Sequence, residues 1–228
     1  ETGRILKRKP KIFKPTKEEG AVHFHMSIDN VPLNHGSWTL MARTNKMARD
    51  FASMLRDDGY LYSYKGHPSL STAIAETMET WEELQDGNRV SMDQIRKFYR
   101  NVPKQGTAAV VKRGATTLLD AAADDDLLGY DQLVADFGLI APIDREPMDI
   151  VKMGFDDKLY IRALERREED ITKPPRIKVS TFHAMKGGED DNCVVYLGST
   201  YACVNTKNQD DEHRAFYVGI TRARKTLH

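Results

Sequence analysis

Short apolar stretches of the kind that form buried strands occur near both ends of the chain and fade in its middle. "WTLMAR" and "YLYSY" come early, and "RIKVSTF" and "NCVVYLG" come late. Residues 21–28, "AVHFHMSI", alternate like a further strand ahead of these. Between about 88 and 172 the pattern changes to short helical segments separated by Gly and Pro. This distribution predicts an α/β domain that is interrupted by a mainly helical insertion.

The order of elements in the first part predicts how its strands pair. Residues 45–59, "NKMARDFASMLRDDG", have helical spacing, with Asn45 as the expected N-cap and Gly59 as terminator. This helix lies between two strand patterns, which favours a right-handed parallel crossover and therefore a parallel sheet flanked by helices. A second helix is expected after Ser69. We divide the chain into 1–87 and 175–228, which form the α/β domain, and 88–174, the insertion.

Composition excludes several classes of protein. Lys plus Arg and Asp plus Glu both number 34, so only local patches, such as the basic residues 4–17, could attract nucleic acid. An apolar run of roughly 18 residues, enough to span a membrane, does not occur in the sequence, and neither does a signal-peptide core. We therefore expect a cytoplasmic protein. The two cysteines do not form a zinc ribbon, and His23 with His25 has no third ligand nearby, so no metal site is expected.

The stretch "KVSTFHAMKGGEDD", residues 178–191, gathers polar groups at the end of an expected strand. Ligands of open α/β sheets bind beyond the carboxyl ends of the strands, where Thr181 and His183 are placed. Lys186 and the Gly187-Gly188 turn could bring a cation and N–H groups close to a phosphate, and Glu189 could accept a hydrogen bond from a hydroxyl. The alternative interpretation is a tight turn with solvated charges.

The stretch "DEHRAFYVGITRAR", residues 211–224, combines an apolar helical stripe with arginines at its end. Arginine holds phosphate oxygens with a rigid fork of donors, so a helix that ends in Thr-Arg-Ala-Arg suits an anionic site. A solvated helix with a few salt bridges is the simpler alternative.

Together these stretches resemble a known family. "STFHAMKGGEDD" and "EHRAFYVGITRAR" are similar to motifs V and VI of the UvrD-like (UvrD, Rep, PcrA) superfamily 1 DNA helicases. "WTLMARTNKMARDFASMLRDDGYLYSYKG" resembles the motif IVa region of the same family. The resemblance implies the second RecA-like half of a helicase motor, with 88–174 at the place of an accessory subdomain.

The resemblance also implies roles for individual residues. Arg222 matches the arginine finger, the expected catalytic residue, and Glu189 with Gly187 is expected to contact ATP. Expected contacts with single-stranded DNA are Thr181, His183, Arg43, Asn45 and Lys186. Expected supports of the motif VI helix are Glu212, Arg214 and Tyr217.

Gly188 and Asp190 depart from the family pattern, which has Leu and Phe at these positions. The sequence also lacks G-x-x-x-x-G-K-[ST], so this chain alone is not expected to hydrolyse ATP. The phosphate-binding loop and the Mg²⁺ ligands are expected in an N-terminal RecA-like half of the same protein.

As a whole, the resemblance implies a 3′ to 5′ helicase, bacterial or phage-encoded, that acts on single-stranded DNA and duplex junctions. An inactive, helicase-derived scaffold that binds DNA or protein is the alternative.

Overall fold

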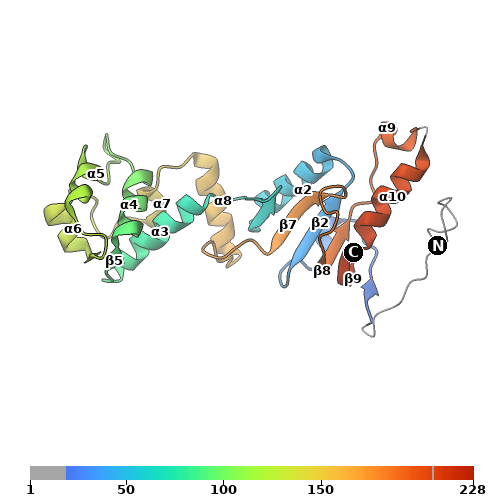
Figure 1. Ribbon diagram of the computed structural model, residues 1–228, viewed down its shortest axis with the longest axis horizontal. Helices are drawn as coiled ribbons and strands as arrows, with labels where there is room; N and C mark the ends of the chain where they lie inside the picture. The colour runs from blue at the N-terminus through green and yellow to red at the C-terminus, as the bar shows by residue number, and fades with distance from the viewer. Residues whose placement is uncertain (1–18, 207) are drawn as a thin grey trace. The chain divides into compact units, whose positions relative to one another are not determined.

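The computed structural model describes residues 19–206 and 208–228 (Figure 1). The chain divides into two compact units, Glu1–Ser69 with Pro175–His228, and Leu70–Pro174. The first unit contains a mostly parallel sheet flanked by helices, and the second is mainly helical, which confirms the predicted fold class. The basic residues 4–17 lie outside the described residues.

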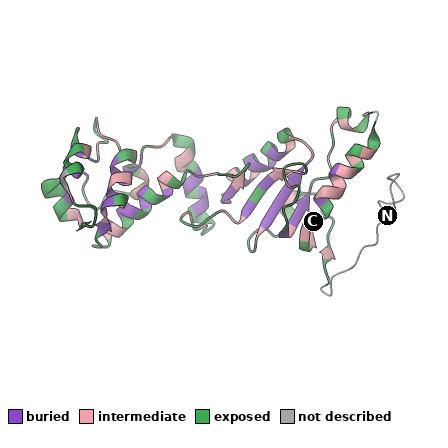
Figure 2. Ribbon diagram, viewed as in Figure 1, coloured by how far each residue is buried: buried purple, intermediate pink, exposed green. Residues whose placement is uncertain are grey.

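The described residues of the first unit form a seven-stranded sheet in the order β1-β9-β8-β2-β7-β3-β4. Every neighbouring pair is parallel except the hairpin of β3 and β4. The strands are β1 (Ala21–Val22), β2 (Trp38–Ala42), β3 (Tyr62–Tyr64), β4 (His67–Pro68), β7 (Ile177–Thr181), β8 (Asp190–Val195) and β9 (Ala223–Leu227). All of β2 is buried (Figure 2). A central parallel strand has both faces covered, which explains why "WTLMA" reads as a continuous, largely apolar run.

Two helices cover opposite faces of this sheet. In α2 (Asn45–Asp57), Phe51 makes an edge-to-face contact with Tyr196, with ring centroids 5.6 Å apart. In α10 (Gln209–Ile220), Ala215 packs in one cluster with Val195. Because successive residues of an extended strand point to opposite faces, α2 and α10 lie on different sides of the sheet.

Two local predictions in the first unit are corrected. Thr44, not Asn45, caps α2, because its hydroxyl accepts from the Met47 amide at 3.3 Å. The strand expected over residues 21–28 is reduced to β1, which pairs only with β9 at the edge of the sheet, and the 3₁₀ helix η1 (Ile28–Asn30) follows. Phe24 is 86% exposed, because this segment leaves the sheet before it can bury alternate side chains.

The second unit packs short helices around its own core. Its elements are α3 (Thr72–Gln85), β5 (Val90–Ser91), α4 (Met92–Asn101), α5 (Ala115–Leu118), η2 (Leu119–Ala121), β6 (Leu127–Leu128), α6 (Tyr130–Asp136), α7 (Pro147–Ile150) and α8 (Phe155–Arg166). Trp81 of α3 stacks on Phe98 of α4 with ring centroids 5.9 Å apart. By its contacts α3 therefore belongs to this unit, which begins at Leu70, whereas the sequence division was drawn at 87/88. Ser71, not Ser69, is the N-cap residue of α3.

Candidate functional site

The segment 182–189 joins the end of β7 to the start of β8. Both strands pair in parallel with β2, so this segment must cross from the carboxyl edge of the sheet to its amino edge. Thr181 and His183 therefore lie at the carboxyl edge, and Gly187 and Glu189 lie at the amino edge. A single motif thus contributes to two separate edges.

Close packing against α10 holds this crossover in place. Phe182 is fully buried, and its ring lies 4.9 Å from that of Phe216 between centroids. A Cβ added to Gly219 would lie 2.9 Å from Phe182 Cδ1, so only glycine allows this approach of the helix. Gly187 has a φ of +88°, a backbone conformation that is strained for residues with a Cβ and therefore favours glycine. At Gly188, the Met185 side chain fills the space that a larger residue at position 188 would need. Its Cε lies 2.8 Å from the position of a Cβ added to Gly188.

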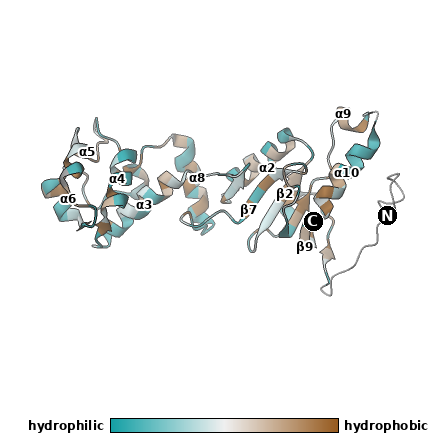
Figure 3. Cartoon of the chain, in the orientation of Figure 1, coloured by the Kyte–Doolittle hydropathy of each residue, from teal (hydrophilic) through white to brown (hydrophobic). Residues whose placement is uncertain are grey.

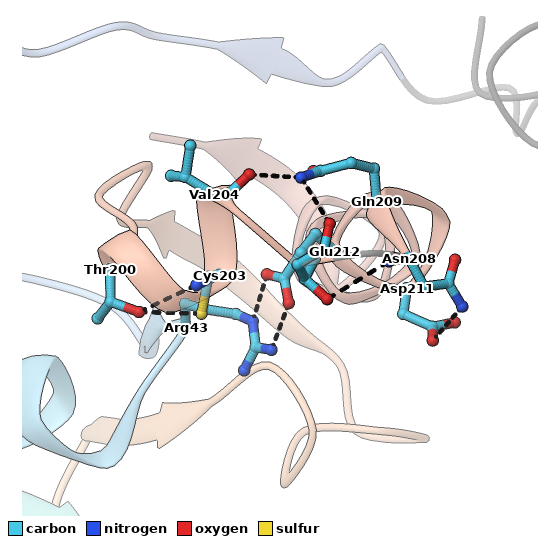
Figure 4. Close-up of polar contacts among 9 residues, drawn as sticks. Arg43, Thr200, Cys203, Val204, Asn208, Gln209, Asp211 and Glu212 are labelled. Atoms are coloured by element: carbon cyan, nitrogen blue, oxygen red, sulfur yellow. Dashed lines mark hydrogen bonds and ion pairs between the residues drawn. The ribbon is translucent and has the colours of Figure 1, made fainter.

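At the carboxyl edge, an ion pair joins the end of β2 to the first turn of α10. Arg43 Nε donates to Glu212 Oε2 at 2.7 Å, and Arg43 Nη2 donates to Oε1 at 2.6 Å (Figure 4). These hydrogen bonds raise the pKa of Arg43 and lower the pKa of Glu212, and nearby His183 lowers the Glu212 pKa further. The side chains are 21% and 13% exposed, so the pair is largely shielded from solvent.

The short helix α9 (Tyr201–Val204) stands beside this pair (Figure 4). Thr200 caps it, since its hydroxyl accepts from the Cys203 amide at 3.3 Å. The Cys203 side chain also helps to lower the Glu212 pKa, and Gln209 donates to the Val204 carbonyl. The first turn of α10 is therefore held from two directions.

The remaining residues predicted to contact DNA are mostly open to solvent. Thr181 is partly exposed, pairs with Ala42 in the sheet, and accepts a hydrogen bond from the Ala184 amide at 3.4 Å. His183 and Asn45 are exposed close to the same edge. Lys186 is exposed within the crossover itself. The structure thus brings Thr181, His183, Arg43 and Asn45 to one edge of the sheet.

At the amino edge, Arg222 follows α10 and precedes β9. Its guanidinium donates to the carbonyls of Val218 at 2.9 Å and Gly188 at 3.0 Å, and to the Thr221 hydroxyl at 2.9 Å. These acceptors are neutral. Because Gly188 adjoins Glu189, this contact draws motif VI toward the end of motif V.

The other motif arginines are paired with carboxylates. Arg224 Nε donates to Glu189 Oε2 at 3.1 Å, in a pair that is exposed on both sides. Arg214 pairs with Asp211 and lies 3.8 Å from Asp210. Tyr217 is half-buried on α10, and its carbonyl accepts from the Thr221 hydroxyl at 2.9 Å. Figure 3 shows that α10 changes from hydrophilic at its start to more hydrophobic at its end.

Asp190 is an organising residue that the sequence showed only as a departure from the family pattern. It is 6% exposed and accepts from Ser37 Oγ at 2.5 Å, Thr39 Oγ1 at 2.9 Å and Lys178 Nζ at 3.2 Å. Burial alone would raise the pKa of Asp190, but these hydrogen bonds outweigh burial, and the pKa is lowered. Asp190 therefore ties the start of β8 to β2 and β7, while its amide donates to the Arg222 carbonyl at 3.0 Å.

Other features of the described structure do not include the predicted site residues. A cavity of about 390 Å³ is lined by residues such as His23, Tyr196 and His228, and the predicted site residues are not among those that line it. Across residues 19–206 and 208–228, three or more His, Cys, Asp or Glu side chains are nowhere grouped so as to hold a metal ion. A helix long and apolar enough to cross a membrane is likewise absent from these ranges.

Comparison with protein families identifies the class of protein. Residues 69–228 match the UvrD-like helicase C-terminal domain. This match covers more than half of the chain, so the chain belongs to that family. It includes both motif V and motif VI, and it begins after the stretch that resembles motif IVa. Curated protein sequences give no match to the chain.

Proposed function

We propose that this chain is the C-terminal motor domain of an ATP-dependent DNA helicase or translocase. The family match and the two motif-bearing edges support this function. The phosphate-binding loop and the Mg²⁺ ligands would come from an N-terminal RecA-like half of the same protein, because the chain has no G-x-x-x-x-G-K-[ST] sequence. The resemblance favours 3′ to 5′ movement on single-stranded DNA, toward duplex junctions.

The observation that carries this proposal is the state of Arg222. Its hydrogen-bond acceptors are neutral carbonyl and hydroxyl groups, so its positive charge is not cancelled by a carboxylate partner. A guanidinium in this state suits the γ-phosphate of ATP, where an arginine finger contributes about 10³ to 10⁵ in rate. Its neutral partners would hold the guanidinium in place while it stabilises charge on the transferring phosphoryl group.

Glu189 would contact the same nucleotide. It precedes Asp190, lies at the edge that carries Arg222, and would accept a hydrogen bond from a ribose hydroxyl. Its present partner, Arg224, forms an exposed ion pair of the kind worth at most about 1 kcal/mol. Exchanging that partner for a ribose hydroxyl would therefore cost little.

The carboxyl edge would hold the DNA strand. Thr181, His183 and Asn45 offer a hydroxyl, an imidazole and an amide close to the ends of two adjacent parallel strands, where ligands of α/β sheets bind. Such polar groups suit the sugar-phosphate backbone and carry no base specificity. The crossover 182–189 would then link the strand-binding edge directly to the ATP edge.

A comparison of neighbouring arginines tests this function. DNA-stimulated ATP hydrolysis should be measured with the full-length protein that contains this chain, as wild type, Arg222→Ala and Arg224→Ala. We expect Arg222→Ala to lower kcat by about two orders of magnitude or more while nucleotide binding is kept. Arg224→Ala should stay within about threefold, since its charge is already paired.

Two results would contradict the proposal. Equal activity of Arg222→Ala and wild type would remove the arginine-finger role. A wild-type protein without DNA-stimulated hydrolysis would favour an inactive scaffold that binds DNA or protein.

A further inference from the structure

Arg43 is expected from the family resemblance to contact DNA, but its guanidinium already has a partner. Its Nε and Nη2 face both oxygens of Glu212 at 2.7 and 2.6 Å (Figure 4). This is the bidentate geometry in which arginine and carboxylate bind most strongly. With both side chains largely shielded from solvent, a phosphate that took Arg43 away would leave the Glu212 carboxylate half-buried and unpaired.

Glu212 connects this pair to the opposite edge of the sheet. It lies in the first turn of α10, and Arg222 follows the end of the same helix. The helix cannot shift freely between these points, because Gly219 lies directly against Phe182 of the crossover. α10 therefore spans from the Arg43–Glu212 pair at one edge to the segment that carries Arg222 at the other, with Gly219 against Phe182 between them.

We propose that Arg43 is a positioning residue that acts through Glu212: it holds α10, and with it the arginine finger, in the geometry needed for hydrolysis. This inference rests on the proposed function. Arg43 then sets the rate of hydrolysis on DNA, not the affinity for DNA. A DNA strand bound at the carboxyl edge next to His183 would influence the position of Arg222 through this same ion pair.

Direct contact between Arg43 and a DNA phosphate makes the opposite prediction. Loss of a phosphate contact weakens DNA binding and lowers the salt dependence of binding by about one unit of slope. It also makes Glu212 a competitor, so that removing the Glu212 charge would strengthen DNA binding or leave it unchanged. The two roles are therefore separated by the DNA affinity of Arg43 variants and by whether removing the Glu212 charge lowers kcat.

The test is a double-mutant cycle in the full-length protein. Arg43→Gln, Glu212→Gln and the double variant are compared for kcat at saturating single-stranded DNA and for the DNA concentration at half-maximal rate. We expect each single variant to lower kcat about tenfold, the double variant to be no worse than the lower single variant, and half-saturation to change less than about twofold. Arg43→Lys keeps the positive charge but lacks the two parallel donors of the guanidinium, so it should give an intermediate kcat. This graded result would separate a positioning role from simple loss of the fold.

Other results would overturn the inference. A rise of about fivefold or more in the half-saturating DNA concentration for Arg43→Gln alone, with a lower salt slope, would make Arg43 a DNA ligand. Multiplying losses of kcat in the double variant would show that the two residues act independently. Both results require an active wild type, whereas an inactive wild type would contradict the proposed function and this inference with it.

Discussion

Arg43 and Arg222 each belong to a stretch that resembles a helicase motif, but they lie at opposite edges of the sheet in opposite electrostatic states. Arg43 is neutralised by a carboxylate that takes two of its hydrogen bonds, while Arg222 donates only to neutral oxygens. A paired arginine is suited to hold structure, and one without a carboxylate is suited to bind an anion. The environment of each arginine, which the motif does not contain, is thus the basis on which we propose a structural role for Arg43 and a reactive role for Arg222.

The two edges are also held together by different means. At the amino edge the buried carboxylate of Asp190 accepts hydrogen bonds from three side chains and one backbone amide. At the carboxyl edge the polar link between the end of β2 and α10 is the Arg43–Glu212 pair. The amino edge should therefore contribute more to folding stability, and the carboxyl edge should be easier to perturb.

The largest expected effect on stability follows from this difference. Asp190→Ala should lower the free energy of unfolding by about 3 kcal/mol, because it leaves the fully buried Thr39 hydroxyl without its acceptor. Glu212→Ala should cost less, about 2 kcal/mol, since it leaves the largely shielded Arg43 unpaired but with 21% of its side chain still open to solvent. Urea unfolding monitored by circular dichroism measures both. Asp191→Ala, which removes only a more exposed pair with Lys225, is the matched control, and equal losses at 190 and 212 would contradict the comparison.

A second substitution probes the contact that joins the two edges. Gly219→Val should cost about 2 kcal/mol, because its side chain would overlap the Phe182 ring. Ile220→Val, at a neighbouring exposed position, serves as control and should change stability by less than about 0.5 kcal/mol. Thermal unfolding of both variants checks the packing, and a Gly219→Val protein as stable as its control would argue against close contact between α10 and the crossover.

The decrease in folding stability at acid pH should reveal the contribution of the Asp190 carboxylate. Its pKa lies below its ordinary value of 3.8 in the folded protein, so the stability it contributes is fully present above about pH 4 and is lost as pH falls through the folded pKa. Asp190→Asn should therefore be less stable than wild type at pH 7, and the difference should shrink below about pH 4. Urea unfolding at a series of pH values measures this. A difference that stays constant from pH 7 to pH 3 would mean that the carboxylate charge contributes nothing.

The smallest expected effect concerns the exposed pair at the amino edge. Arg224→Ala should change stability by less than about 0.5 kcal/mol, because both Arg224 and Glu189 are solvated. The effect should shrink further in high salt. A loss above about 1 kcal/mol in urea unfolding would show that this pair helps to hold the amino edge together.

Sequence patterns predicted the sheet well because its central strands are continuous apolar runs and its helices are periodic. They failed at residues 21–28, where alternation suggested a long strand but the edge position allows pairing over two residues only. The motifs supplied the candidate site residues, but the sequence pattern placed the whole of 178–191 at the end of one strand, whereas the structure divides this stretch between two edges of the sheet.

Side-chain contacts between the motifs could not be predicted from the sequence in the same way. Arg43 and Glu212 are separated by 169 residues, and no local pattern connects them. Asp190 was visible only as a charged residue where the family has an aromatic one. Its role depends on the fold, in which Ser37 just before β2, Thr39 of β2 and Lys178 of β7 converge on it.

The most direct measurement of the division between the two edges compares His183→Ala with Arg222→Ala in the full-length protein. For each variant, DNA affinity and kcat at saturating DNA are determined under the same conditions. Our account predicts that His183→Ala weakens DNA binding but keeps most of kcat, whereas Arg222→Ala loses about two orders of magnitude or more in kcat and keeps DNA affinity. If both variants lost the same property, the assignment of DNA to one edge and ATP to the other would be wrong.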